Sequence, residues 1–231
     1  GRRGFNLRRP WCSFGSGRGR LRVNIIDSRR LTGLNLTSPG PSAITDVAFS
    51  EEDNAVAFLD RWSQALDEMF DAIGWPHMAR WVRQYSGGAS LVIDAPLDAL
   101  YAATEINEWA IRQANGESTT VEEMAVTIAL AIEEEANPDL IALQEAAEIH
   151  GTPFVWDDDY VSIGLGKYSQ TWPTSDLPKA DTIEWKNFKR IPFGYITGTN
   201  GKTTTTRMAM AILRAANISH AGTSSDGVVV N

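Results

Sequence analysis

Apolar residues recur at three- and four-residue steps between residues 55 and 73, so one face of this stretch is almost continuously hydrophobic. Such spacing predicts a long amphipathic helix whose apolar face packs against a core. Ser50 and the acidic residues 51–53 predict the N-cap and first turn of this helix. Gly74 and Pro76 predict where the helix ends.

Similar periodicity predicts three further helices. One covers residues 96–114. The next begins at a capping box formed by Thr119 and Glu122, ahead of apolar residues spaced three and four apart. The last opens with Asn137 as the cap, followed by a first-turn proline, and ends near His150.

Short runs of β-branched and apolar residues between turn-forming segments predict strands. These runs cover residues 23–26, 43–49, 90–93, 152–156 and 160–165. No internal repeat is apparent in the sequence. Because helices and strands are mixed without a regular alternation, we predict an α/β chain whose N-terminal domain is of the α+β kind.

Composition and periodicity divide the chain into four parts. Residues 1–21 are rich in arginine and glycine and contain no acidic residue, which predicts a disordered basic tail, with an RNA-binding tail as the alternative. Residues 22–165 contain the periodic segments and form the predicted N-terminal domain. Periodicity fades over residues 166–189, which predicts a linker, and residues 190–231 contain a glycine-rich motif.

The net charge of −8 conceals a more acidic body. Outside the first twenty residues, 15 basic residues stand against 29 acidic ones, a balance of −14. A surface of this kind offers no track for the phosphate backbone of a nucleic acid, so we expect no nucleic-acid partner. No apolar run approaches the ~20 residues of a membrane helix, so we expect no membrane partner either.

Cysteine and histidine are scarce. Cys12 is the only cysteine, which excludes a disulfide within the chain and fits a reducing, cytoplasmic setting. The three histidines, His77, His150 and His220, lack the spacing of metal ligands, so we expect no structural zinc site.

The strongest chemical signal is a glycine-rich loop between an expected strand at residues 191–197 and an expected helix at residues 203–216. Glycines let backbone amides approach an anion, and the helix N-terminus adds a favourable dipole. Lys202 would reach the terminal phosphates of a nucleoside triphosphate, and the Thr203 hydroxyl would ligate Mg²⁺. We therefore predict the first strand-loop-helix unit of a P-loop-type parallel sheet, with a chance turn as the alternative. The cofactors would be ATP and Mg²⁺, and the binding residues Gly198, Thr199, Asn200, Gly201, Lys202, Thr203 and Thr204.

The spacing of the loop narrows its class. A strict eight-residue phosphate-binding loop has a glycine where this chain has Ile196, and here the first glycine, Gly198, lies only three residues before Gly201. This shortened Gly-Thr-Asn-Gly-Lys-Thr loop resembles the nucleotide loop of the Mur ligase superfamily. That superfamily includes the peptidoglycan ligases, folylpolyglutamate synthase and cyanophycin synthetase.

The Thr- and Ser-rich segment 222–227, which ends in Asp-Gly, resembles a segment that follows the nucleotide loop in the cyanophycin-synthetase family. The resemblance implies a site for the carboxylate end of an acceptor, lined by Thr223, Ser224, Ser225 and Asp226. A hairpin turn at Asp226-Gly227 is the alternative, and the two interpretations are compatible.

Residues 23–165 resemble, more loosely, the N-terminal domain of the same family. The element Arg29–Asn35 is similar to that domain's opening Arg-x-Leu-x-Gly-x-Asn, and the order of helices agrees. The ATP-grasp domain that follows in that family is missing here, because only roughly twenty residues lead to the glycine loop. Some relatives have a His-x-x-Glu-His metal motif in this domain, whereas the corresponding helix here has Glu105 and Glu108 without histidine.

These resemblances imply an ATP-dependent carboxylate–amine ligase. In such enzymes ATP phosphorylates a carboxylate to an acyl phosphate, and an amine then attacks it to form an amide. Lys202 would be the catalytic residue that stabilises charge on the transferring phosphoryl group. The partners would be a small-molecule or peptide-like carboxylate and an amine, while their identities and homo-oligomerisation stay open. The family's metal-binding glutamate, modified lysine and C-terminal domain follow the loop, so we expect this chain to be the N-terminal part of the enzyme, inactive alone.

Several features have alternative interpretations. The chain could be a non-catalytic module that binds a polymer or partner through residues 22–165 and keeps a vestigial nucleotide loop. The acidic residues 157–159 could bind a cation, although a hairpin turn explains them as well. Arg29 and Arg30 could hold an acidic substrate tail or form a solvated surface pair. Four tryptophans could form a polymer-binding platform or part of the core: Trp62, Trp81, Trp109 and Trp156.

Overall fold

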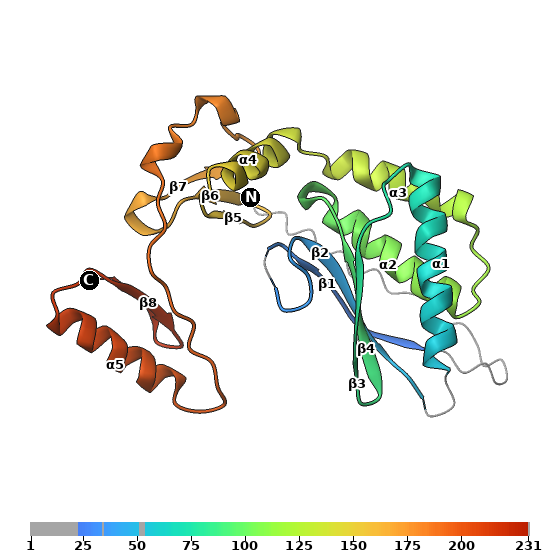
Figure 1. Ribbon diagram of the computed structural model, residues 1–231, viewed down its shortest axis with the longest axis horizontal. Helices are drawn as coiled ribbons and strands as arrows, with labels where there is room; N and C mark the ends of the chain where they lie inside the picture. The colour runs from blue at the N-terminus through green and yellow to red at the C-terminus, as the bar shows by residue number, and fades with distance from the viewer. Residues whose placement is uncertain (1–22, 34, 51–53, 231) are drawn as a thin grey trace, which may run out of the picture.

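A computed structural model of the chain describes residues 23–33, 35–50 and 54–230 (Figure 1). The predicted basic tail and the acidic residues 51–53 lie outside the described residues. The described chain mixes helices with antiparallel strands, which agrees with the predicted α/β class.

The largest sheet has four antiparallel strands in the order β1-β2-β4-β3. They are β1 (Asn24–Leu31), β2 (Ser42–Ala48), β3 (Arg80–Tyr85) and β4 (Gly88–Asp94). β1 extends further than predicted and includes Arg29 and Arg30. The sequence pattern missed β3, because it is an edge strand without a buried residue and lacks an apolar run. A two-residue turn ending at Gly87, where φ is 78°, pairs β3 with β4.

The helices of this part of the chain agree closely with the predicted ones. They are α1 (Ala55–Ile73), α2 (Leu100–Ala114), α3 (Val121–Glu135) and α4 (Pro138–Ile149). A single 3-10 turn, η1 (Leu97–Ala99), leads into α2. α1 and α2 pack side by side over one face of the four-stranded sheet, and α3 contacts both helices (Figure 1).

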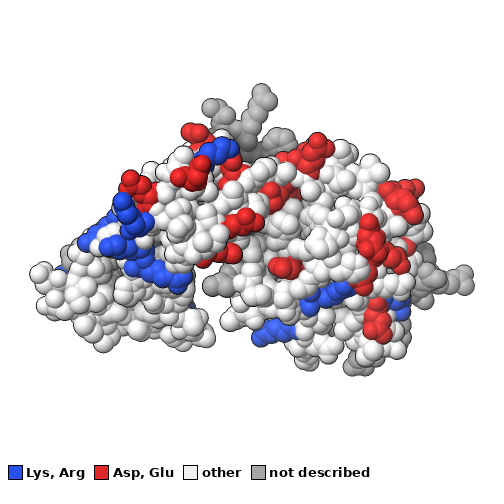
Figure 2. Space-filling model, turned by 45° about the horizontal axis from the view of Figure 1, so that its top comes forward, with Lys and Arg blue, Asp and Glu red and all other residues white. Residues whose placement is uncertain are grey.

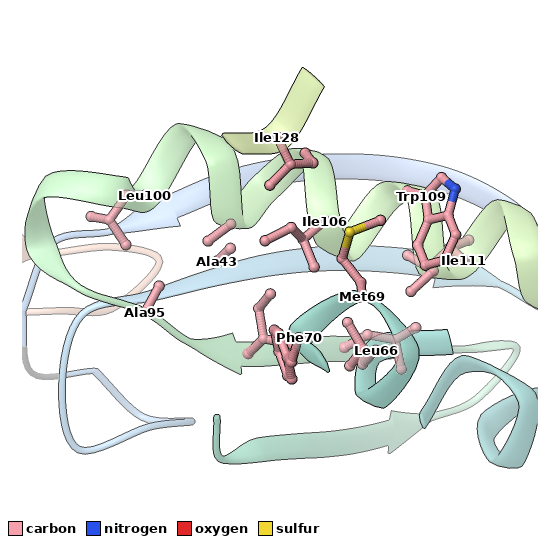
Figure 3. Packing of buried hydrophobic residues seen from close by; sticks show 14 of the residues in the cluster. Ala43, Leu66, Met69, Phe70, Ala95, Leu100, Ile106, Trp109, Ile111 and Ile128 are labelled. Carbon is pink, nitrogen blue, oxygen red and sulfur yellow. The ribbon is translucent and has the colours of Figure 1, made fainter. Parts of the chain in front are cut away.

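The core lies between α1, α2 and the inner face of this sheet (Figure 3). The predicted apolar face of α1 is buried in it through Phe58, Trp62, Leu66, Met69 and Phe70. Trp62 and Trp109 are 1% and 2% exposed, so they belong to the core and form no surface platform. The other two tryptophans considered for a platform, Trp81 and Trp156, are half-buried.

Asn107 of α2 is fully buried in this core, and its amide group is hydrogen-bonded on both sides. The indole Nε1 of Trp62 donates to its Oδ1 at 2.9 Å. Its Nδ2 donates to the Thr45 hydroxyl at 3.1 Å and to the Leu91 carbonyl at 3.0 Å. Because a buried polar group without partners is costly, this network favours one position of α2 against α1 and the sheet.

Two helix starts differ from the prediction. The N-cap of α1 is Asn54 rather than Ser50, and its Oδ1 accepts a hydrogen bond from the backbone N–H of Ala57 at 3.1 Å. The capping box of α3 is formed by Thr120 and Glu123, one residue after the predicted pair. The physical reason is the preceding residue, Thr119, whose carbonyl accepts from the Gln113 side chain at 2.7 Å and is thereby tied to the end of α2.

A smaller antiparallel sheet follows α4. Its strands are β5 (Phe154–Trp156), β6 (Tyr160–Ile163) and β7 (Gln170–Pro173), in that order. The acidic residues 157–159 form the hairpin turn between β5 and β6, in which Asp157 Oδ1 accepts from the backbone N–H of Asp159 and Tyr160. This geometry favours the turn interpretation of the acidic run over cation binding.

The segment that periodicity predicted as a linker has structure of its own. Besides β7 it contains the 3-10 turns η2 (Gly166–Tyr168), η3 (Ala180–Thr182) and η4 (Trp185–Asn187). Its apolar residues are partly buried against the core, among them Trp172, Leu177, Ile183, Trp185 and Phe188. Sequence periodicity could not detect this packing, because the apolar residues are held by irregular turns that have no repeat.

The last part of the chain contains α5 (Lys202–Ala215), β8 (Ala221–Ser224) and β9 (Gly227–Val230). α5 was predicted within one residue, and β8 and β9 form the hairpin that was the alternative for this segment. The predicted strand at residues 191–197 is absent, and every strand pair in the described chain is antiparallel, so the described residues give no evidence of the predicted parallel P-loop-type sheet. A strand needs a hydrogen-bonded neighbour, and residues 191–197 are exposed and have none.

Candidate phosphate-binding loop

The glycine-rich loop connects an exposed extended segment to α5. Gly198 has a φ of 142° and Gly201 a φ of 80°, and both values favour glycine over residues with a side chain. Gly201 is the N-cap of α5, and because it has no side chain it cannot accept a hydrogen bond from the N–H groups of the first turn, as a capping side chain does. The N–H groups in the first turn of α5 are therefore open to an external acceptor.

This helix start has the physical properties of an anion site. The amides of a first helical turn point along the axis, and the helix dipole adds partial positive charge. Residues 198–202 are all exposed, so an anion can reach the amides directly. There is no acidic residue in the first turn to compete for them.

Lys202 folds back over the loop. Its Nζ donates to the carbonyl oxygens of Gly198 at 2.5 Å and Thr199 at 3.3 Å. These are neutral acceptors, so the charge of the ammonium group is not balanced by a carboxylate at this point. A phosphate placed over the loop would be a stronger partner than these carbonyl oxygens, because its negative charge attracts the ammonium group directly.

The β8–β9 hairpin lies against the first turns of α5. The hydroxyls of Thr203 and Ser225 are 3.0 Å apart. One turn further along α5, Arg207 Nε donates to Asp226 Oδ2 at 2.8 Å, and Nη2 of the same arginine is 2.7 Å from that oxygen. Gly222 permits this close approach, because a Cβ there would lie 2.6 Å from the sulfur of Met210. The tertiary fold thus brings the Thr- and Ser-rich segment 222–227 to the start of α5.

The predicted acceptor-binding residues separate into two pairs. Ser225 and Asp226 occupy the turn and contact α5. Thr223 and Ser224 lie on β8, where the Ser224 hydroxyl accepts from the backbone N–H of Asp226 at 3.2 Å. Sequence reasoning did not single out Arg207. The signal that could have found it is its spacing of four from Thr203, which places both on one face of α5.

The residues present fit a phosphate group better than a metal ion. Backbone amides, one lysine and two hydroxyls are suitable for phosphate oxygens. For Mg²⁺ the loop offers the Thr203 hydroxyl, with Ser225 beside it, while Asp226 is engaged by Arg207. Among the residues that the structure describes, no group of three His, Cys, Asp or Glu side chains is placed to hold a metal. The loop by itself therefore offers too few oxygen ligands for Mg²⁺, which prefers several oxygen ligands including phosphates.

Arg29 and Arg30, considered above as ligands for an acidic tail, are engaged with carboxylates. Arg29 contacts Asp46 at 2.7 Å and Asp27 at 2.5 Å. Arg30 forms two parallel bonds to Asp158, at 2.8 and 3.0 Å, and these hold the pKa of that carboxyl below its usual value. Both arginines thus form ion pairs within the fold, and for Arg30 these pairs engage both terminal nitrogens of the guanidinium.

Arg30, which lies on β1, belongs to a cluster at the start of α2 that also includes Tyr101 and Glu135. Its guanidinium lies 3.6 Å from the centroid of the Tyr101 ring. Glu135 of α3 caps the start of α2 by accepting from the backbone N–H of Tyr101 at 2.9 Å and of Ala102 at 2.6 Å. Burial raises the pKa of Glu135 despite these bonds. The cluster joins β1, α2, α3 and the β5–β6 turn, which is a structural role.

Comparison with models of known families and with curated proteins gave no match to this chain. Among the helices that the structure describes, none has the length and apolar character that crossing a bilayer requires.

Proposed function

We propose that this chain is the N-terminal part of an ATP-dependent carboxylate–amine ligase of the Mur ligase type. In the reaction, a carboxylate oxygen attacks the terminal phosphorus of ATP, giving an acyl phosphate and ADP. An amine then attacks the acyl carbon, the amide bond forms and phosphate leaves. The observation that carries the proposal is the shortened glycine loop at a helix start without a side-chain cap, with Lys202 folded back over the loop.

In this proposal each part of the loop has a defined task. The amides of the first turn of α5 hold phosphate oxygens, and Lys202 places a positive charge where negative charge develops during transfer. Thr203 would hold the magnesium that accompanies the nucleotide. The contact between Thr203 and Ser225 places the acceptor-binding turn next to this group, which suits a reaction between the two substrates.

A binding measurement on the full chain tests the loop directly. Isothermal titration calorimetry with Mg²⁺ and a non-hydrolysable ATP analogue should show one saturable site. Lys202→Ala should weaken binding at least about tenfold, because it removes a charge-assisted hydrogen bond to phosphate. Lys179→Ala is the matched control, since this lysine pairs with Asp139 and should leave the affinity unchanged.

Two outcomes would contradict the assignment. One is absence of saturable binding, and the other is equal affinity of the wild-type chain and the Lys202→Ala variant. A turnover measurement on the natural gene product is the second test. It should release ADP and phosphate only when a carboxylate and an amine are both supplied, and unstimulated hydrolysis at the same rate would count against a ligase.

The alternative is a non-catalytic binding module with a vestigial loop. The exposure of all residues from 191 to 202 favours it, because catalytic phosphate sites exclude water when they act. This alternative predicts that residues 22–165 carry the binding activity of the chain. It would be supported by polymer binding that is unaffected by Lys202→Ala, together with absence of ATP turnover.

A further inference from the structure

A hollow of about 410 Å³ lies between the end of α4 and the segment that leads to the glycine loop. One wall is formed by His150 and residues 151–153. The other wall is formed by Trp185 and Lys186 of η4 together with residues 188–190. We call it the basic hollow. Its volume lies within the range of small-molecule sites, and none of its residues belongs to the loop at residues 198–204.

The aromatic wall of the basic hollow is held in place from several sides. The rings of His150 and Trp185 are stacked, with centroids 4.9 Å apart and planes inclined by 9°. The indole Nε1 of Trp185 donates to the Ala180 carbonyl at 3.2 Å, and the Phe188 ring meets the indole edge-on at 6.5 Å. One face of the indole is thus covered by His150, and the stacked pair as a whole gives the hollow a fixed aromatic boundary that suits a flat organic group.

Three cations, Lys186, Lys189 and Arg190, line the hollow, and no carboxylate does. Arg190 Nε donates to the Gly151 carbonyl at 3.2 Å, which fixes the guanidinium at the wall and leaves its terminal nitrogens for another acceptor. The backbone of Lys189 is anchored by the bond from Leu165 N–H to its carbonyl at 3.0 Å. The ammonium of Lys189 lies 5.2 Å from the centroid of the Tyr168 ring.

Carboxylates do not closely balance the cations of the basic hollow, a property that they share with some other basic side chains, including Lys202. Elsewhere in the described chain, six basic side chains contact a carboxylate at 3.4 Å or less: Arg29, Arg30, Arg80, Arg112, Lys179 and Arg207. In the basic hollow, Lys186 has the longer carboxylate contact to Glu184, at 4.0 Å, and among the described residues no ion pair involves Lys189 or Arg190. Figure 2 shows a group of basic side chains toward the end of the molecule that contains residues 165–231, with acidic side chains beside it and smaller basic groups elsewhere on that face.

We propose that the basic hollow binds a small phosphorylated compound, with its phosphate at Lys189 and Arg190 and a flat organic group beside the stacked His150–Trp185 pair. A doubly charged phosphate matches several adjacent cations better than a single carboxylate does, and the arginine fork suits its oxygens. In a chain with a net charge of −8, this local positive potential selects anions. The site is independent of the nucleotide loop and of the ligase proposal.

Amide chemical-shift mapping by NMR on the full ¹⁵N-labelled chain tests the site, because it locates the ligand as well as measuring affinity. The probes are phenyl phosphate, inorganic phosphate and benzoate. Phenyl phosphate should shift the amides of residues 150–152 and 185–190 with saturation, and it should bind more tightly than the other two probes. The double variant Lys189→Gln, Arg190→Gln should lower the affinity for phenyl phosphate at least about tenfold. Lys202→Ala should leave these shifts unchanged.

The matched control is Lys167→Gln, Lys179→Gln, which removes the same charge from two lysines outside the lining of the hollow. Should the first variant fail to fold, Lys186→Gln, Lys189→Gln keeps the Arg190–Gly151 bond and should weaken binding in the same direction. Shifts confined to residues 198–204 would overturn the proposal, as would shifts that do not saturate. An equal loss of affinity for phenyl phosphate in the control variant would overturn it too. Benzoate binding as tightly as phenyl phosphate would overturn the phosphate assignment.

Discussion

Residues 23–189 and residues 190–230 are built in different ways. The first region contains every buried side chain of the described residues, including those between α1, α2 and the sheet. The second region has a helix and a hairpin but no buried residue, and large apolar side chains such as Phe193, Ile212 and Val228 are 66–74% exposed. The first is therefore held by a core, whereas the second is held by local contacts.

The difference teaches which elements can form from local signals alone. α5 needs a glycine cap and its own hydrogen bonds, and the β8–β9 hairpin needs a two-residue turn. The expected strand at residues 191–197 needs a neighbour from elsewhere in the chain, and it does not form. An exposed apolar surface of this extent is also uncommon on a stable domain. The glycine loop thus belongs to the less stable of the two regions.

Hydrogen exchange should show the largest difference between the two regions. Amides in the middle of α1 and α2 should exchange only through global unfolding, whereas those of α5 should exchange through local opening. We expect protection factors that differ by at least about three orders of magnitude, measured by mass spectrometry or NMR at fixed pH. Equal protection of α2 and α5 would show that the second region has a core of its own.

Truncation of one apolar side chain in each region should give the next largest effect. Phe70 of α1 is fully buried, so Phe70→Ala should lower the free energy of unfolding by about 3–5 kcal/mol. Ile212 of α5 is 66% exposed, so Ile212→Ala should change it by no more than about 0.5 kcal/mol. Urea titration followed by circular dichroism measures both values. A loss at Ile212 as large as that at Phe70 would contradict the comparison.

The ion pairs of the two regions should give the smallest effect. Asp158 has a lowered pKa because of Arg30, so this pair stabilises the fold above the ordinary pKa of 3.8 and loses its effect as the pH falls through the lowered value. Arg30→Gln should cost about 0.5–1 kcal/mol at pH 7, since Asp158 is 54% exposed and solvent screens the pair. The cost should shrink at pH 3, which urea titrations at the two pH values would measure.

Arg207→Gln provides the counterpart in the second region, where the pair with Asp226 is more exposed on the arginine side, at 69%. We expect Arg207→Gln to leave the free energy of unfolding of the first region almost unchanged. If the cost of Arg30→Gln were the same at pH 3 as at pH 7, the contact of Arg30 with the Tyr101 ring would account for it instead of the ion pair.

Local chemistry made much of the fold predictable. Gly74 ends α1 with a φ of 71°, and Asn137 caps α4, because left-handed glycine and side-chain caps act within a few residues of the helix end. The buried face of α1 followed from periodicity. β3 was missed, since an exposed edge strand has no apolar pattern of its own. The Thr120 cap differed by one residue, since Gln113, from α2, holds the preceding residue.

For the candidate site, the sequence by itself determined the contiguous part: the two glycines, Lys202 and the helix start, whose geometry depends on neighbours in the chain. Only the tertiary structure decided which distant residues meet. It placed Ser225 beside Thr203 and Asp226 on Arg207, and it assembled the basic hollow from His150 and residues 185–190. Such contacts depend on how packed elements orient side chains far apart in sequence, and no local pattern encodes that orientation.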